Sequence, residues 1–185
     1  MEHSHKAVTV DGVVKVLRGM GVLEQIVARA SAETRRVLED PHCARLHPGS
    51  VMDEAFTILS SLLGTEAVAQ VMYRATQASL AGIAGPLGRL FMTMMGGGPA
   101  PLLQRFDTLA SSGTSGFKAT WYPTGDHAGR MHITAAEVTP PVAEFAWQGT
   151  LQYLLVFASV EGRVTPLPRE DGGLTLVLEV AWTPR

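Results

Sequence analysis

Two short groups of side chains in this 185-residue chain are of types that could carry out chemistry. The first is His42, Cys43 and His47, and imidazole and thiolate are ligands that zinc prefers. A structural zinc site needs four ligands, and no second group of cysteine or histidine at a recognised spacing supplies the rest. We therefore regard these three residues as weak candidates for a metal site. The simpler interpretation is a polar loop with a half-exposed thiol.

The second group is Asp126, His127, Arg130 and His132. A carboxylate beside an imidazole is a pairing used in general acid–base catalysis. Adjacent residues of a turn rarely point at one position, and no serine or cysteine nucleophile in a sharp strand–turn–helix setting accompanies them. The sequence therefore predicts no catalytic residue and a non-enzymatic protein, while a small enzyme using His127 or His132 remains an alternative.

A run of soft apolar side chains between residues 90 and 95 could form a binding surface. Methionine adapts to irregular shapes, so such a run can line a pocket or a groove for a partner. Phe91 and Met94 share one helical face with Leu90 and are predicted to be ordinary core. Met92 and Met95 lie on another face, where their burial needs a second contact. An enclosed cavity lined by Leu90, Met92 and Met95 would indicate a ligand site, and a flat exposed patch would indicate a protein interface.

The composition excludes several classes of protein. Apolar residues make up 46% of the chain, charged residues 17%, and the formal net charge is −2 with scattered lysines and arginines, which argues against a nucleic-acid binder. A single cysteine excludes an internal disulfide framework and fits a reducing compartment.

The amino terminus is polar and has no secretory signal, and its His3 could chelate copper only by chance, so we assign His3 no function. The most apolar stretch, 142–160, is interrupted by polar residues and is predicted to be a buried helix of a cytoplasmic protein rather than a membrane span.

The elements that must position these residues change in character near residue 113. Before that point, apolar residues recur at steps of three and four. This pattern predicts helices over about 11–29, 32–38, 51–63, 66–80 and 102–110. Gly19 and Gly21 weaken the first helix, and Ser31 and Ser50 are predicted N-caps. Residues 41–50 are predicted to be a loop, and 111–116 a flexible joint.

After residue 113, alternating apolar and polar residues predict four strands around one apolar helix. The strands are predicted over 117–122, 130–138, 163–167 and 174–182, and the helix begins at Pro140–Pro141 and ends at Gly162. The fold class is therefore α+β, a single domain over 1–185. Its N-terminal helical layer (1–112) packs with a C-terminal ββαββ four-stranded antiparallel sheet (113–185).

Several short features of the sequence together resemble a known family. They are Leu46-His47-Pro48 before a helix, Leu63-Gly64 at a helix end, a helix over Leu102 to Phe106, Pro140-Pro141, Gly149-Thr150-Leu151, and a closing strand that ends in Glu179-Val180-Ala181-Trp182. On these residues the chain resembles, from Val13 to Trp182, the paralogous family of uncharacterised proteins found in myxobacteria. That family is distantly similar to the superfamily of haem nitric-oxide/oxygen-binding domains, 4-vinyl reductase domains and vesicle-tethering (TRAPP-type) subunits.

The resemblance implies a ligand-binding or assembly module. The haem branch needs a proximal histidine on the helix before the sheet and a Tyr-x-Ser-x-Arg run. Because no histidine lies between His47 and His127, and the run is absent, we expect no haem and no other cofactor. The vesicle-tethering branch suggests an apolar pocket able to hold an acyl chain, which would give Met92, Met95 and Trp147 a role.

We therefore expect a non-enzymatic cytoplasmic binding module that acts in signalling or assembly. Its partner would be an apolar small molecule or a protein, with no nucleic acid and no membrane span, and the candidate binding residues are Leu90, Met92, Met95 and Trp147. The rival hypothesis is a protein-interaction subunit without a ligand, which forms a homodimer through an apolar face of the helical layer.

Overall fold

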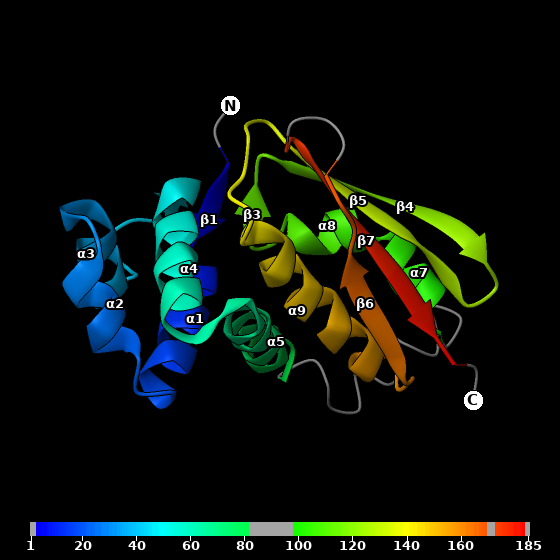
Figure 1. Cartoon of the computed structure of the whole chain (residues 1–185), viewed down its shortest axis with the longest axis horizontal. Helices are drawn as coiled ribbons and strands as arrows, with labels where there is room; N and C mark the ends of the chain where they lie inside the picture. The colour runs from blue at the N-terminus through cyan, green and yellow to red at the C-terminus, as the bar shows by residue number, and fades with distance from the viewer. Residues whose placement is uncertain (1–2, 82–97, 170–172, 184–185) are drawn as a thin grey trace.

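The computed structural model describes residues 3–81, 98–169 and 173–183. Figure 1 shows a helical layer beside a second layer that is made of a sheet and the helices that cover it. The elements of the first part are β1 Ser4–Lys6, α1 Ala7–Gly19, α2 Leu23–Arg29, α3 Ala32–Glu39, β2 Leu46–Pro48, α4 Gly49–Leu63 and α5 Thr65–Ala81. Those of the second part are α7 Pro99–Gln104, α8 Phe106–Ala110, β3 Thr114–Ser115, β4 Phe117–Gly125, β5 Ala128–Ala135, α9 Ala143–Phe157, β6 Gly162–Pro166 and β7 Thr175–Trp182.

The helices of the first layer begin and end largely as the sequence predicts. The break expected at the two glycines is present, since α1 ends at Gly19 and Gly21 has a φ of +71°. Ser31 caps α3 and accepts a hydrogen bond from the Thr34 amide. The predicted cap at Ser50 is wrong: α4 begins at Gly49, whose amide donates to the His3 carbonyl instead.

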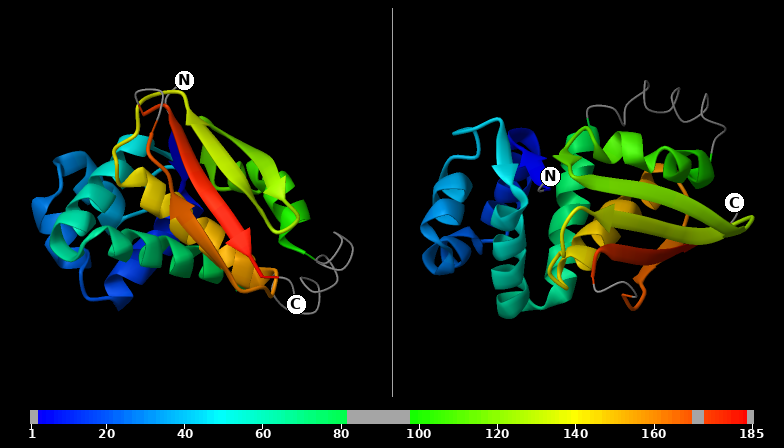
Figure 2. Two further views of the ribbon diagram at one scale, coloured as in Figure 1. Left: turned by 45° about the vertical axis from the view of Figure 1, so that its right-hand side comes forward. Right: turned by 90° about the horizontal axis from the view of Figure 1, so that it is seen from above.

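The four-stranded sheet is antiparallel, in the order β4-β5-β7-β6, and confirms the predicted α+β class. Figure 2 shows this sheet from above, beside the helical layer. Because side chains alternate between the two faces of a strand, Met131, Leu178 and Val180 all point to the buried face and are fully buried there. Helix α9 packs on that face, while Lys118 and Arg130 on the other face are exposed.

Both edge strands of this sheet have backbone groups that other parts of the chain bind. On β6, the Gln152 amide donates to the Gly162 carbonyl and accepts from the Val164 amide, and Gln148 donates to the Val164 carbonyl. On β4, the Ala119 amide donates to a carboxylate oxygen of Asp107 in α8. Helix α9 is therefore fixed to β6 by side-chain hydrogen bonds as well as by apolar packing.

A second, smaller sheet has the order β2-β1-β3 and was missed by the sequence analysis. β2 lies within residues 41–50, which were predicted to be a loop, and β3 lies within 111–116, which were predicted to be a flexible joint. Both predictions are wrong in this respect, because strands of two or three residues are too short to show a periodic pattern. β1 is the central strand and joins segments from the two layers.

The two layers meet along α5 and α9. Gly149 on α9 lies against the backbone of Ala69 on α5, so closely that a Cβ atom at Gly149 would overlap the Ala69 carbonyl oxygen. Helix α9 belongs to both hydrophobic cores: Phe145 and Ala146 pack with the helical layer, and Trp147 and Leu151 pack with the sheet. None of the helices in the described residues combines the length and the hydropathy that crossing a bilayer requires.

Candidate functional site

The binding residues that the sequence analysis proposed fall into two groups. Leu90, Met92 and Met95 lie outside the described residues. Trp147 lies on the sheet side of α9 and is 9% exposed. Its ring packs edge-on against Phe106 and Phe117, with ring centroids 5.8 Å and 5.3 Å away. Trp147 therefore contributes to the core between α9, α8 and β4.

The three weak metal candidates are not brought together. His42 and Cys43 are exposed, and the His42 Nε2 lies 3.8 Å from a carboxylate oxygen of Asp11. His47 is buried because β2 turns it inward, and its Nε2 lies 2.7 Å from the Pro41 carbonyl oxygen. Across residues 3–81, 98–169 and 173–183, no three histidine, cysteine or acidic side chains are placed to hold a metal ion.

The histidines of the β4–β5 hairpin also lie apart from each other. The His127 ring packs against Trp182, with centroids 6.1 Å apart, and the His132 ring packs against Tyr122 at 4.7 Å. Asp126 is exposed in the turn. Each imidazole therefore has its own aromatic neighbour.

A groove of about 560 Å³ runs along the contact between α5 and α9. Its apolar surface comes from Ala69 and Tyr73 on α5 and from Phe145 and Gly149 on α9. The Tyr73 ring meets the Tyr153 ring edge-on, with centroids 5.3 Å apart. Burial, followed by the nearby Tyr73, raises the pKa of Tyr153.

The rim of this groove is polar. Glu66 and Arg74 lie on α5, two turns apart, which places opposite charges about 12 Å from each other along the helix. Gln70 on α5 and Gln148 on α9 also line the groove. The groove can therefore accommodate a molecule with an apolar body and one or two polar groups.

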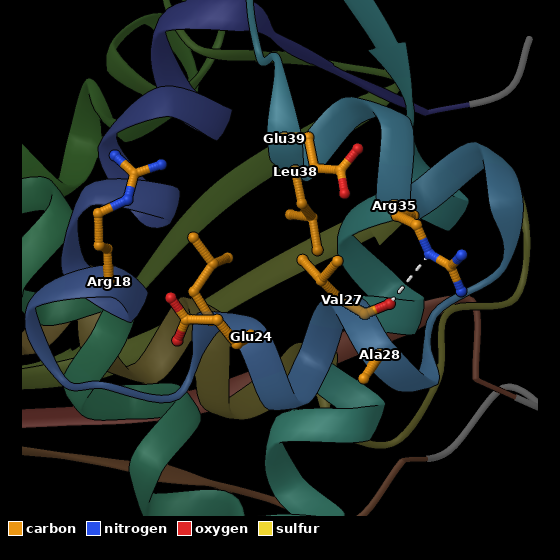
Figure 3. Close-up of a pocket in the computed structure, with 8 residues that line it drawn as sticks. Arg18, Glu24, Val27, Ala28, Arg35, Leu38 and Glu39 are labelled. Carbon is orange, nitrogen blue, oxygen red and sulfur yellow. Dashed lines mark hydrogen bonds between the residues drawn. The ribbon is translucent and has the colours of Figure 1, made fainter.

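A second groove, of about 640 Å³, lies in the helical layer between α1, α2 and α3. Figure 3 shows Val27 and Leu38 near its centre, between the charged side chains of Arg18, Glu24 and Glu39. Arg35 donates from Nε to the Val27 carbonyl, so its guanidinium supports the turn between α2 and α3. This groove is more polar than the first and lies away from the contact between the layers.

A cluster of histidines at the small sheet was not predicted: His3 and His47 are buried, and His5 is half-buried. His3 is 2% exposed, and its Nδ1 donates to the Glu137 carboxylate over 2.6 Å. Its Nε2 lies 3.4 Å from an Asp53 carboxylate oxygen, which is long for a hydrogen bond, so the bond to Glu137 is the better formed of the two. The Asp53 carboxylate raises the pKa of His3, against the opposing effect of burial, and Glu137 raises it further.

The pKa of the neighbouring His5 is shifted in the opposite direction from that of His3. Its ring lies 5.9 Å from the His3 ring, and its Nδ1 is buried without a hydrogen-bond partner in the described structure. The pKa of His5 is lowered to about 4. Burial is the largest cause of this shift, and the nearby His3 and His47 contribute to it. A signal for this pair does exist in the sequence: His3 and His5 are two residues apart, the spacing that places side chains on one face of a strand.

The fold matches solved structures of H-NOX proteins along nearly the whole chain. A Cs H-NOX mutant with 4-cyano-L-phenylalanine at site 5 is 16% identical with a TM-score of 0.68, and the match covers 97% of each chain. A K. algicida H-NOX mutant, Fe(II) and unliganded, is 10% identical with a TM-score of 0.67, again over 97% of each chain. An oxygen-binding H-NOX domain related to soluble guanylate cyclases is 14% identical with a TM-score of 0.62, over 97% of this chain and 95% of that one. At these identities the likeness establishes the fold.

In sequence, residues 45–183 match the profile of a family described as proteins of unknown function, DUF2378. No curated protein matches the sequence.

The side chains present do not fit a histidine-ligated haem of the kind that the fold suggests. His3, His5 and His47 lie in or beside the small sheet, and His3 and His47 are already paired there. His127 and His132 lie in the β4–β5 hairpin. The sequence has no histidine between His47 and His127, so α4, α5, α7 and α8 have no imidazole to offer.

Proposed function

This chain belongs to the DUF2378 family and has the H-NOX fold, and we propose that it is a non-enzymatic binding module for an apolar small molecule. The ligand lies in the groove between α5 and α9. The observation that carries the proposal is the position of this groove, which has apolar and aromatic walls, a polar rim and a volume in the range of small-molecule sites.

The groove also suits a role in signalling. It lies where the helical layer meets the sheet layer, and α9 is fixed to β6 by Gln148 and Gln152. A ligand that pushes on α9 would therefore displace the sheet edge together with the helix. Binding would be read out as a change in the spacing between the two layers.

The finer expectations from the sequence are part of this proposal. Leu90, Met92 and Met95 lie outside the described residues, and their role in binding stays part of the proposal. Trp147 supports α9 from the sheet side. We further propose a cytoplasmic protein of the myxobacterial paralogous family, with homodimerisation through the helical layer as the alternative to ligand binding.

Binding of N-phenyl-1-naphthylamine, a fluorophore that brightens in apolar surroundings, tests the groove. Tyr73→Ala removes one aromatic wall, so we expect its affinity for the dye to fall about tenfold, which corresponds to about 1.4 kcal/mol. Tyr122→Ala is the matched control, because Tyr122 is 51% exposed on the open face of the sheet. Equal dye affinity in the wild type and Tyr73→Ala would refute the groove as the site.

Native mass spectrometry of the purified chain, before and after denaturation, tests for a resident ligand. A small mass lost on denaturation supports the proposal and starts the identification of the ligand. A bare chain at twice the monomer mass would favour the protein-interaction alternative.

A further inference from the structure

The segment from His3 to Ala7 contacts both layers of the molecule. On the helical side, the His3 carbonyl accepts from the Gly49 amide, and the Ala7 amide donates to the Arg45 carbonyl. On the sheet side, the Lys6 amide donates to the Gly113 carbonyl, and His3 binds Glu137. The segment is thus a clasp, a second connection between the layers besides the apolar contact of α5 with α9.

Unlike the α5–α9 contact, the clasp is held by titratable groups. His3 faces Asp53 on α4 and Glu137 after β5. His5 faces His3, which lies just before β1, and His47 on β2. From β3 and β4, the neighbours are Ser115, whose hydroxyl lies 2.7 Å from that of Ser4, and the Phe117 ring, neither of which is charged near neutral pH.

We propose that this clasp is a pH-dependent conformational switch, in which the pair of buried His3 and half-buried His5 docks strand β1 near neutral pH and acidification releases it. The release would separate the helical layer from the sheet layer at this end of the molecule, while the α5–α9 contact stays closed. The geometry supports this because the docked strand buries a His5 nitrogen without a partner. A proton on that nitrogen therefore costs less free energy once the strand leaves and water can reach it.

Protonation of the two histidines has opposite effects on the docking of β1. Docked His5 has a lowered pKa of about 4 against 6.5 when released, so below pH 6.5 the released strand takes up the proton and docking weakens. Docked His3 has a raised pKa, so its contribution is complete below pH 6.5 and is lost as the pH rises through the docked value. Docking is therefore strongest near pH 6.5 and weakens on both sides.

The size of the acid effect follows from these values. Between pH 6.5 and 4.5, His5 weakens docking about 40-fold, and His3 strengthens it by at most about twofold in the same interval. The net loss is about 20-fold. Hydrogen exchange measures it, as the protection of the Lys6, Ala7 and Gly49 amides corrected for the intrinsic exchange rate at each pH. We expect protection at these amides to fall about 20-fold and protection in α5 and α9 to stay constant.

Two sets of variants isolate the cause. His5→Asn keeps a polar side chain that does not titrate, so the acid-induced loss of protection should disappear, while His132→Asn on the open sheet face should leave it intact. Ser4 and Ser115 are directly paired between β1 and β3, so Ser4→Cys with Ser115→Cys, in a Cys43→Ser background, can form a disulfide that locks the clasp.

The oxidised form of the double-cysteine variant should keep its protection at pH 4.5, and the reduced form of the same protein should lose it. The switch is refuted if protection at Lys6, Ala7 and Gly49 is the same at pH 6.5 and 4.5 in the wild type. It is also refuted by an equal loss in His5→Asn, or by an equal loss in the oxidised and reduced forms. None of these outcomes depends on a ligand in the α5–α9 groove, so the two proposals fail or stand separately.

Discussion

Adding one methyl group at Gly149 should loosen the contact between the two layers. A Cβ atom built at Gly149 would lie 2.8 Å from the carbonyl carbon and 3.0 Å from the Cα of Ala69, and would overlap the carbonyl oxygen. These neighbours are backbone atoms that cannot rotate away, so α5 and α9 must move apart by about half an ångström or more, given carbon–carbon contacts of about 3.5 Å. Overpacking of this kind costs about 1–3 kcal/mol, and a backbone clash belongs at the upper end.

The same substitution also removes a glycine from a helix, which stabilises by about 1 kcal/mol. The expected net loss for Gly149→Ala is therefore about 2 kcal/mol, or a fall of about 5 °C in the unfolding midpoint for a chain of this length. Gly12→Ala in α1 is the matched control: its Cβ would lie 3.9 Å from the nearest atom, in ordinary contact, so it should stabilise by up to about 1 kcal/mol. Urea denaturation measures both.

The two variants should change the free energy of unfolding in opposite directions: Gly149→Ala lowers it and Gly12→Ala raises it. If Gly149→Ala is as stable as the wild type, or gains stability as Gly12→Ala should, the close approach of α5 and α9 is not a feature of the folded protein in solution. The groove would then not lie on a tightly fixed contact. The m-value of each variant should match the wild type, because a change there would indicate an altered denatured state instead.

Three further predictions concern single side chains. Gln152→Ala leaves two backbone groups of β6 without partners and should destabilise by about 2 kcal/mol in urea denaturation, whereas Gln77→Ala on the exposed face of α5 should change little. Arg169→Lys cannot reproduce the guanidinium bonds to the Thr139 and Pro140 carbonyls, so calorimetry should show a loss of about 1–3 kcal/mol, and unchanged stability would contradict that geometry. Because the folded pKa of His5 is about 4 and the unfolded value 6.5, and His3 opposes the effect by at most about twofold, stability should fall by about 2 kcal/mol as the pH is lowered from 6.5 to 4. Thermal melts across this pH range measure the loss, and an equal loss in His5→Asn would mean that another group causes it.

The sequence predicted the fold class and most helices because their apolar residues recur over several turns. Val13, Val14 and Leu17 on α1 illustrate this: the spacing marks one face, and the structure buries all three. The ββαββ order was predictable for the same reason, since β7 alternates without interruption from residue 174 to 182. The end of α9 was misplaced: the helix stops at Phe157, and Gly162 is instead the first residue of β6.

The candidate sites were harder to predict because long-range contacts create them. Nothing near His3 in the sequence reveals Glu137, which is 134 residues away, or Asp53 on α4. The groove depends on a glycine, Gly149, whose role is visible only when α5 lies against it. Leu90, Met92 and Met95 lie outside the described residues, so their predicted role in binding remains a prediction.

The hydrogen bonds on the two sheet edges have a consequence for how this protein behaves at high concentration. An unpaired edge strand is a template on which strands of other molecules add, and such addition begins many fibrils. Here the outward amide of Val164 is bound by Gln152, that of Ala119 by Asp107, and Pro123 and Pro166 have no amide hydrogen to offer. Asp107→Ala should therefore leave the fold intact and yet make the protein prone to aggregation, as a fault of solubility rather than of stability.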